Sequence, residues 1–177
     1  MRNSLQAKHT LGFTLVELIV VILLLGILTV LVAPRFQSKG SVVEYTYQSR
    51  LISALRTMQQ RAMNDTRAGY CFQVNVFTGS NSSFGPPTLN YRTGGAAATC
   101  ANTIDSSEAA DYVTADIDEF VSDKVIITSG AGTINFNSLG CPNNGAGFCN
   151  NPVKITIQGV NTLSVCVESQ GYIHACD

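Results

Sequence analysis

The sequence contains few of the side chains that enzymes and nucleic-acid-binding proteins use. Its 177 residues include only 2 histidines, and charged residues make up 13% of the chain. His9 lies close to the start and His174 close to the end, so no Ser-His-Asp arrangement can be nominated. The formal net charge is −1, whereas a nucleic-acid-binding protein normally carries a basic face. We therefore expect no catalytic residues and no nucleic-acid partner.

Sequence motifs for metals and cofactors are also lacking. There is no C-x-x-C pair, and only His174 could assist the cysteines, which disfavours a zinc site. Carboxylates between residues 108 and 119 could bind calcium, but the glycine and terminal glutamate of an EF-hand loop are missing. A solvated helix face is the preferred interpretation of this acidic run. The sequence predicts no cofactor and no metal site.

One long hydrophobic run is present near the N-terminus. Phe13 to Phe36 is almost entirely apolar, and Leu18 to Ala33 carries no charge. As a helix, the longer run would span roughly 36 Å, enough to cross a hydrocarbon core of about 30 Å. A buried core helix would show polar residues on at least one face, and this run does not. We expect a transmembrane helix at residues 13–36.

Residues 1–12 do not form a usual secretory signal. Such a signal places its apolar stretch before a small-residue cleavage site. Here a polar, mildly basic leader comes first, and no clear A-x-A site follows the apolar run. A different kind of export and processing is therefore indicated.

The remaining chain predicts helices packed on strands. Apolar residues at three- and four-residue steps indicate an amphipathic helix that continues from the first one, with stop signals at residues 64–69. The residues of this stripe are Val43, Tyr47, Leu51, Ala54, Leu55, Met58 and Ala62. A further helix is predicted from Ser107 to Ser122, capped by Ser106 or Ser107.

Six segments rich in Val, Ile, Phe and Tyr have the composition of strands. They are residues 70–77, 124–128, 133–137, 153–158, 162–168 and 172–175. Residues 129–132 and 169–171 look like hairpin turns, and residues 78–105 like a long loop. An antiparallel sheet packed on the amphipathic helix is the simplest way to bury these faces, which gives an α+β fold.

The cysteines all lie beyond the apolar run. They are Cys71, Cys100, Cys141, Cys149, Cys166 and Cys176. An even number of cysteines in an exported domain implies up to three disulfides and an oxidising compartment, and fifteen pairings are possible. A hairpin about Gly171 would place Cys166 opposite Cys176, so this pair is favoured. The pair 141–149 comes next, which leaves 71–100 to clamp the long loop. An oxidised head also places the N-terminus in the cytoplasm.

Residues 12–17, G-F-T-L-V-E, followed by the apolar helix, closely resemble the type IV prepilin signature. The resemblance implies that prepilin peptidase cuts between Gly12 and Phe13 and methylates Phe13. It also implies that Glu17 pairs with the α-amine of Phe13 of a neighbouring subunit. An unpaired carboxylate in a dry filament core would be severely destabilising. The alternative is that Glu17 reaches the lipid headgroups.

Pro34 lies where many type IV pilins carry a helix-distorting proline. It either ends the membrane helix or introduces a bend that allows repacking during assembly, and both interpretations stay open. The resemblance implies a type IV pilin-like fold, in which a long N-terminal helix, half of it transmembrane, packs on an antiparallel β-sheet head. The expected parts are a leader at 1–12, a transmembrane and filament-core helix at 13–36, and a periplasmic or extracellular head at 37–177.

Two C-terminal segments narrow the resemblance. Residues 133–140 and 164–173 look like the tail of H-type pseudopilins and minor pilins, and are similar to minor pilins of the mannose-sensitive haemagglutinin (MSHA) pilus. Major pilins usually close one C-terminal loop with a disulfide, and six cysteines depart from that pattern. The resemblance therefore implies a minor pilin or pseudopilin that takes part in pilus assembly.

The partners implied are prepilin peptidase, other pilin or pseudopilin subunits, an inner-membrane assembly platform and the inner membrane itself. The implied location is the bacterial inner membrane, with a single pass, followed by the periplasm or a cell-surface pilus. Two alternatives remain within the family, an H-type pseudopilin of type II secretion and an adhesin-like head on a pilin stalk. A membrane-anchored enzyme would need a set of reactive residues that the sequence does not contain.

Overall fold

The computed structural model describes residues 14–32, 42–65, 72–87, 100–106, 113–130, 132–143, 147 and 149–176. The chain divides into two compact units, residues 1–39 and residues 40–177. The predicted leader, the residues Gly12, Phe13 and Pro34, and the junction of the two predicted N-terminal helices lie outside the described residues.

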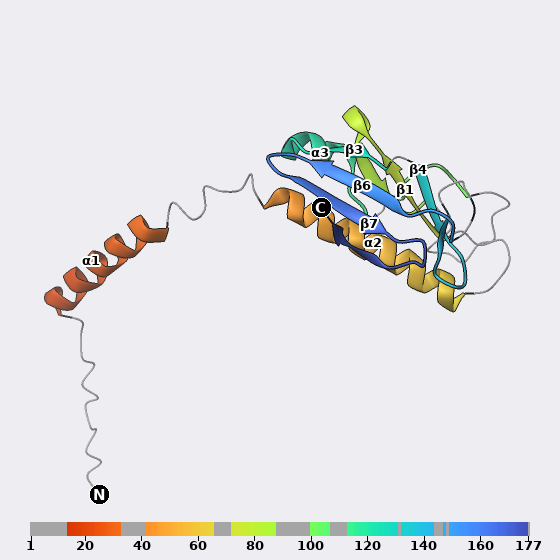
Figure 1. Ribbon diagram of the computed structural model, residues 1–177. Coiled ribbons are helices and arrows are strands. Elements are labelled where there is room, and N and C mark those ends of the chain that lie inside the picture. Colours follow the sequence, from red (N-terminus) through yellow and green to blue (C-terminus); the bar gives the residue numbers. More distant parts are fainter. Residues whose placement is uncertain are drawn as a thin grey trace, which may run out of the picture. The chain divides into compact units, whose positions relative to one another are not determined.

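The first unit contains helix α1 (Leu15–Val32) (Figure 1). Its sequence is apolar around the whole circumference, apart from Glu17 and Thr29. The large apolar side chains from Leu15 to Leu28 are all between 43% and 75% exposed. Within the described part of the chain, no helix combines the length and the hydropathy needed to cross a membrane.

Helix α2 (Val43–Asn64) is the longest element of the second unit and lies along its strands (Figure 1). The predicted apolar stripe is its packing face, with only Val43 partly exposed. The buried apolar residues are Tyr47, Leu51, Ala54, Leu55, Met58 and Ala62. The helix contacts strands of two different sheets, so this stripe organises the whole core.

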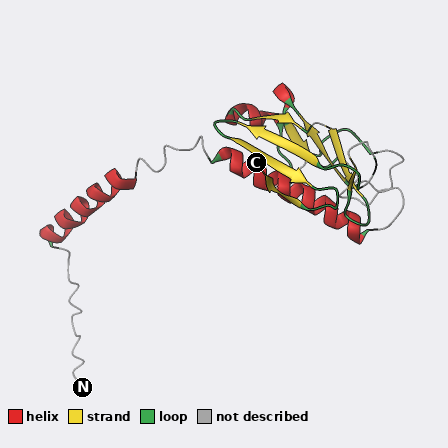
Figure 2. Cartoon of the chain, viewed as in Figure 1, coloured by secondary structure: helices red, strands yellow, loops and turns green. Residues whose placement is uncertain are grey.

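Two antiparallel four-stranded sheets pack with α2, where the sequence predicted a single sheet (Figure 2). The first has the order β2-β1-β4-β5 and the second β3-β6-β7-β8. The strands of the first are β1 (Gln73–Phe77), β2 (Ser83–Gly85), β4 (Gly132–Phe136) and β5 (Pro142–Asn143). Those of the second are β3 (Ile126–Ser129), β6 (Val153–Gln158), β7 (Thr162–Val167) and β8 (Ile173–Cys176). The α+β class is as predicted.

The segment at residues 129–132 is a connection between sheets, so its prediction as a hairpin turn is wrong. Strand β3 pairs with β6, whereas β4 pairs with β1. Two glycines of the segment have positive φ, 85° at Gly130 and 123° at Gly132, a conformation that glycine adopts readily. By contrast, residues 169–171 do form the β7–β8 hairpin turn, with Gly171 at φ 91°.

Helix α3 (Ile117–Asp123) is shorter than the helix predicted for residues 107–122. Residues 113–116 are not helical, because Ala115 instead exchanges two backbone hydrogen bonds with Phe84 of β2, at 3.0 and 2.9 Å. The cap is therefore not Ser106 or Ser107. Asp116 and Glu119 form a capping box at the true start of the helix.

The predicted loop at residues 78–105 contains regular structure. The 3-10 turn η3 (Gly79–Asn81) and strand β2 both lie in it. Strand β2 is too short to show a periodic pattern and is defined by its pairing with β1. Its Phe84 meets Phe120 of α3 edge to face, with ring centroids 6.1 Å apart.

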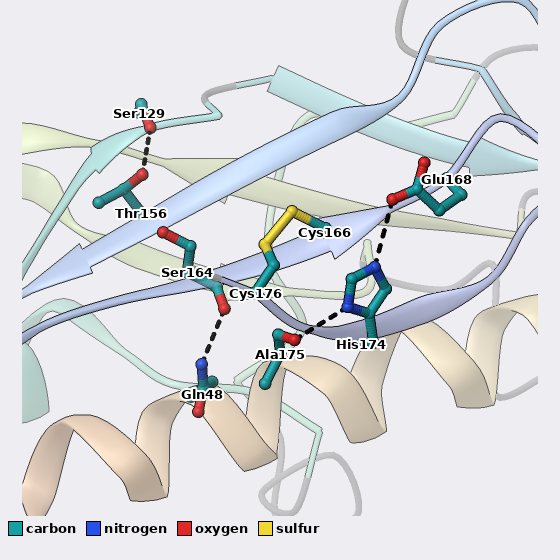
Figure 3. Close-up of a disulfide and its surroundings, with 9 residues drawn as sticks. All are labelled: Gln48, Ser129, Thr156, Ser164, Cys166, Glu168, His174, Ala175 and Cys176. Atoms are coloured by element: carbon teal, nitrogen blue, oxygen red, sulfur yellow. Dashed lines mark hydrogen bonds and ion pairs between the residues drawn. A yellow bond between two sulfur atoms is a disulfide. The ribbon is translucent and has the colours of Figure 1, made fainter.

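Two disulfides join the C-terminal strands and loops. Cys166 of β7 bonds Cys176 of β8 across the hairpin (Figure 3). Cys141 bonds Cys149, and both pairs are as the sequence predicted. Cys100 is also disulfide-bonded. Cys71 lies outside the described residues, so the 71–100 pair stays a prediction.

Candidate functional site

The start of α1 is organised by Thr14. Its side-chain Oγ1 accepts the backbone N–H of Glu17 at 3.2 Å, and its carbonyl accepts the N–H of Leu18 at 3.2 Å. Thr14 is thus the N-cap of the helix, and Glu17 is its third residue. Sequence analysis missed this role of Thr14, although the T-x-x-E spacing of a capping box would have revealed it.

Glu17 is the one charged residue of α1. Its position in the first turn suits a carboxylate, because the helix dipole places partial positive charge there. The carboxylate makes no hydrogen bond or ion pair with any residue in the described part of the chain. Its predicted pairing with the α-amine of Phe13 of a neighbouring subunit stays a prediction, because Phe13 lies outside the described residues.

The two tail segments that resembled minor pilins meet at Gln59 of α2. Its side-chain Nε2 donates to the carbonyl of Gly140 at 2.8 Å and to the carbonyl of Gly171 at 2.5 Å. Both glycines have positive φ, and a Cβ on Gly171 would collide with the backbone of Gly140. The positive φ favours glycine at both positions, and the close approach to the Gly140 backbone additionally requires glycine at position 171.

A comparison with known protein families gives a match in the N-terminal segment. Residues 8–33 match the prokaryotic N-terminal methylation motif. The match spans Gly12, Phe13 and Glu17, and it supports a type IV pilin-like protein. The family of this motif is structural rather than enzymatic. No curated protein and no solved structure matches the chain.

Glu44 anchors the first turn of α2. It is fully buried, and its Oε1 accepts the backbone N–H of Asn161, in the β6–β7 turn, at 2.9 Å. A Cβ on Gly159 would lie 2.5 Å from the same oxygen, so glycine makes room for the carboxylate. Burial raises the pKa of Glu44, but backbone N–H groups, including those of Asn161 and Val160, outweigh it and hold the pKa below its usual range.

A second buried polar residue, Gln48, lies one turn further along α2. Its Nε2 donates to the carbonyl of Ser164 in β7 at 2.7 Å (Figure 3). Neither Glu44 nor Gln48 was singled out from the sequence. Both occupy positions on the stripe that contains Leu51 and Leu55, and a polar residue on an apolar stripe is the feature that would have identified them.

His174 of β8 lies in a small polar cluster with Glu168. Its Nε2 lies 3.2 Å from Oε1 of Glu168, and its Nδ1 lies 2.9 Å from the carbonyl of Ala175 (Figure 3). Tyr172 stacks on its ring. No Ser or Cys side chain of the described residues shares these hydrogen bonds. Among the residues described, no three His, Cys, Asp or Glu side chains are grouped to hold a metal ion.

The pKa of His174 is expected to lie above its ordinary value of 6.5. The Ala175 carbonyl and then the Glu168 carboxylate raise it, since both favour the protonated ring. Any stability from this pairing is therefore present at acidic pH and lost as the pH rises through the raised pKa. An NMR titration should show the raised pKa, and Glu168→Gln should lower it. The chain has two histidines, so the His9→Gln variant shows which NMR signal belongs to His174. An unchanged pKa of His174 in Glu168→Gln would exclude the carboxylate as a cause.

Proposed function

We propose that this protein is a minor pilin or pseudopilin that assembles into a type IV pilus-like filament. Prepilin peptidase removes residues 1–12 and methylates Phe13, and the N-terminal helix then joins the subunits. The observation that carries this proposal is the motif match at residues 8–33, because it covers the cleavage position and Glu17 together. The exposed apolar surface of α1 supports it, since such a surface requires lipid or other helices around it.

We infer that residues 13–36 insert in the inner membrane before assembly and that the head lies in the periplasm or at the cell surface. The uncharged stretch from Leu18 to Ala33 supports insertion. The Cys141–Cys149 and Cys166–Cys176 disulfides support an oxidising compartment for the head. Pro34 would bend or end the helix at the boundary of this segment.

A minor position in the filament is the finer part of the proposal. The resemblance of residues 133–140 and 164–173 to minor pilins of the MSHA pilus, the MshC group among them, supports it. Gln59 donates a hydrogen bond to each of these two segments, so they lie next to each other on α2. An H-type pseudopilin of type II secretion is the competing assignment. Cross-linking in cells to pilus subunits or to secretion pseudopilins distinguishes the two.

N-terminal sequencing of membrane-extracted protein tests the processing step. In cells that contain prepilin peptidase, the mature chain should begin at Phe13 and carry one N-methyl group. Cells that lack the peptidase should retain residues 1–12, and a Gly12→Leu variant should be left uncut in either strain. A mature end at any other residue, or full processing without the peptidase, would refute the proposed cleavage.

A further inference from the structure

A groove lies where β1, η3 and α3 approach one another in the head. Its main cavity has a volume of about 710 Å³, within the roughly 300–1,000 Å³ that is typical of small-molecule sites. A second cavity of about 360 Å³ adjoins it. The two share Phe77, Asn81 and Asn102, and together they are called the β1–α3 groove below.

The side chains of the groove suit a neutral, hydroxyl-rich ligand. Among the described residues that line it, none is Lys, Arg or His, so a phosphate or carboxylate would find no cation there. Asn81, Asn102 and Asp118 are exposed, and their side chains form no hydrogen bond with the described part of the chain. The amides provide donors and acceptors, and the carboxylate provides acceptors. Hydroxyl groups can satisfy all of them.

An aromatic side chain completes this chemistry. Phe77, at the end of β1, lines both cavities and is 37% exposed. An aromatic ring packs well against the C–H face of a sugar, and burying that face removes apolar surface from water. A saccharide is the class of neutral ligand that combines one C–H face with several hydroxyl groups.

One wall of the groove is held in place by buried amides of β1. Gln73 and Asn75 are 1% and 2% exposed, and both donate to the carbonyl of Ala101, at 3.0 and 2.9 Å. Asn75 also donates to the carbonyl of Thr103 at 3.0 Å. Satisfied buried hydrogen bonds of this kind rigidify the segment that they hold. Asn102 therefore has a defined position over β1.

The opposite wall is fixed by an ion pair. Arg50 of α2 bonds Glu119 of α3, with Nη1 and Oε2 2.5 Å apart, and it also bonds the carbonyl of Thr114. The Arg50 hydrogen bond holds the pKa of Glu119 below its usual range. Glu119 in turn accepts the N–H of Asp116 at 3.3 Å. These contacts set the first turn of α3, which carries Asp118.

The part of the groove formed by η3 is also held by hydrogen bonds. Ser82 Oγ accepts the backbone N–H of Ile127 at 2.8 Å and donates to the carbonyl of Gly79 at 2.7 Å. This fixes η3, and with it Asn81. A groove whose three sides are already ordered loses little conformational entropy when a ligand binds.

We propose that the β1–α3 groove binds a neutral saccharide, with a sugar face on Phe77 and its hydroxyl groups bonded by Asn81, Asn102 and Asp118. This activity goes beyond the filament role and does not depend on it. A peptide strand is disfavoured, because the outer edge of β2 is already paired with Ala115 and offers no free edge for strand addition.

Binding of the detergent-solubilised full chain to immobilised oligosaccharides tests the proposal. The array carries neutral hexose and N-acetylhexosamine oligomers, sialylated oligomers and extended peptides. We expect retention on neutral sugars, with Phe77→Ala and Asp118→Asn each reducing the affinity on the order of tenfold, the effect of losing about 1.4 kcal/mol of contact.

The matched control is Tyr172→Ala, which removes an aromatic ring that is 64% exposed but does not line the groove. It should bind like the parent protein. Asp118 is an exposed residue and its isosteric change to Asn preserves the fold, which circular dichroism checks. The proposal is overturned by no retention on any neutral sugar, by retention only on sialylated sugars or peptides, or by equal affinity in the two groove variants and the parent.

Discussion

Glu17→Gln is expected to reduce incorporation into filaments by about a hundredfold or more, while the head stays folded. The variant removes one partner of a charge pair that we propose forms with the α-amine of Phe13 on the next subunit. Loss of one partner in a buried pair costs about 3–5 kcal/mol, and each 1.4 kcal/mol is about tenfold in an equilibrium constant. Glu17 belongs to the first unit and the head to the second, so its loss leaves the head core intact.

A second variant, Thr14→Ala, separates the charge of Glu17 from its place in the helix cap. Thr14 accepts the backbone N–H of residue 17, which Glu17→Gln retains, so this variant alters the charge and preserves the cap. Thr14→Ala does the reverse, because it removes the Oγ1 that accepts the Glu17 N–H. We expect Thr14→Ala to weaken assembly only modestly, since a lost cap costs about 1 kcal/mol.

The measurement is the amount of each variant in sheared, purified filaments relative to its amount in membranes. Circular dichroism of the extracted protein, with intact disulfides, confirms the folded head. Incorporation of Glu17→Gln at the parent level would exclude the pairing with the Phe13 α-amine. The role of Glu17 would then be limited to the first turn of α1. A deficit in Thr14→Ala as large as that of Glu17→Gln would likewise assign the effect to the cap.

Phe120→Ala is expected to destabilise the head by about 3–5 kcal/mol, the usual cost of truncating a buried phenylalanine. Phe120 is 1% exposed. Its ring stacks on Tyr47 of α2 at a centroid distance of 4.2 Å and meets Phe84 of β2 edge to face. The ring therefore contacts both α2 and β2 within one core, and its removal leaves a cavity between these elements and α3.

Val121→Ala is the matched control, because the neighbouring residue of the same helix is 64% exposed. Its effect should stay within about 0.5 kcal/mol. Urea unfolding followed by near-ultraviolet circular dichroism measures both values. A loss below about 1 kcal/mol in Phe120→Ala, or equal losses in the two variants, would show that α3 is not part of the cooperative core.

The apolar pattern of the chain was sufficient to predict α2 and most strands of the second sheet. On α2 the repeat at three and four residues persists for several turns, so the buried face is determined by local spacing. Strands β6 and β7 alternate buried and exposed residues or carry β-branched side chains. The Cys166–Cys176 bond followed from the same hairpin, because the turn at Gly171 brings those strands together.

Other elements depend on pairing between distant segments. Strand β2 is three residues long and β5 is two, too short for any periodicity. Residues 113–116 lie next to α3, yet their backbone pairs with β2 instead of continuing the helix. Ala115 is held in this conformation by hydrogen bonds to Phe84, about thirty residues earlier in the sequence. A local helical pattern cannot reveal such a distant partner.

The β1–α3 groove was likewise beyond sequence reasoning. Asn81, Asn102 and Asp118 come from a turn, a loop and a helix that carry no shared motif. They line one cavity only because Gln73 and Asn75 hold the loop on β1 and Arg50 holds the start of α3. An isolated polar residue in a loop gives no indication of what it will face.

The sequence by itself determined the N-terminal part of this protein. Residues 8–33 match the prokaryotic N-terminal methylation motif through side chains that are adjacent along the chain, and the processing, membrane and assembly roles that we propose rest on this short stretch. In the head, the division into two sheets, the short helix α3 and the β1–α3 groove became evident only from the tertiary structure. The physical reason is the sequence range of the interactions. Apolar helices and cleavage motifs depend on residues that are close in the sequence. Sheet order and pocket geometry depend on contacts between segments that are far apart in the sequence.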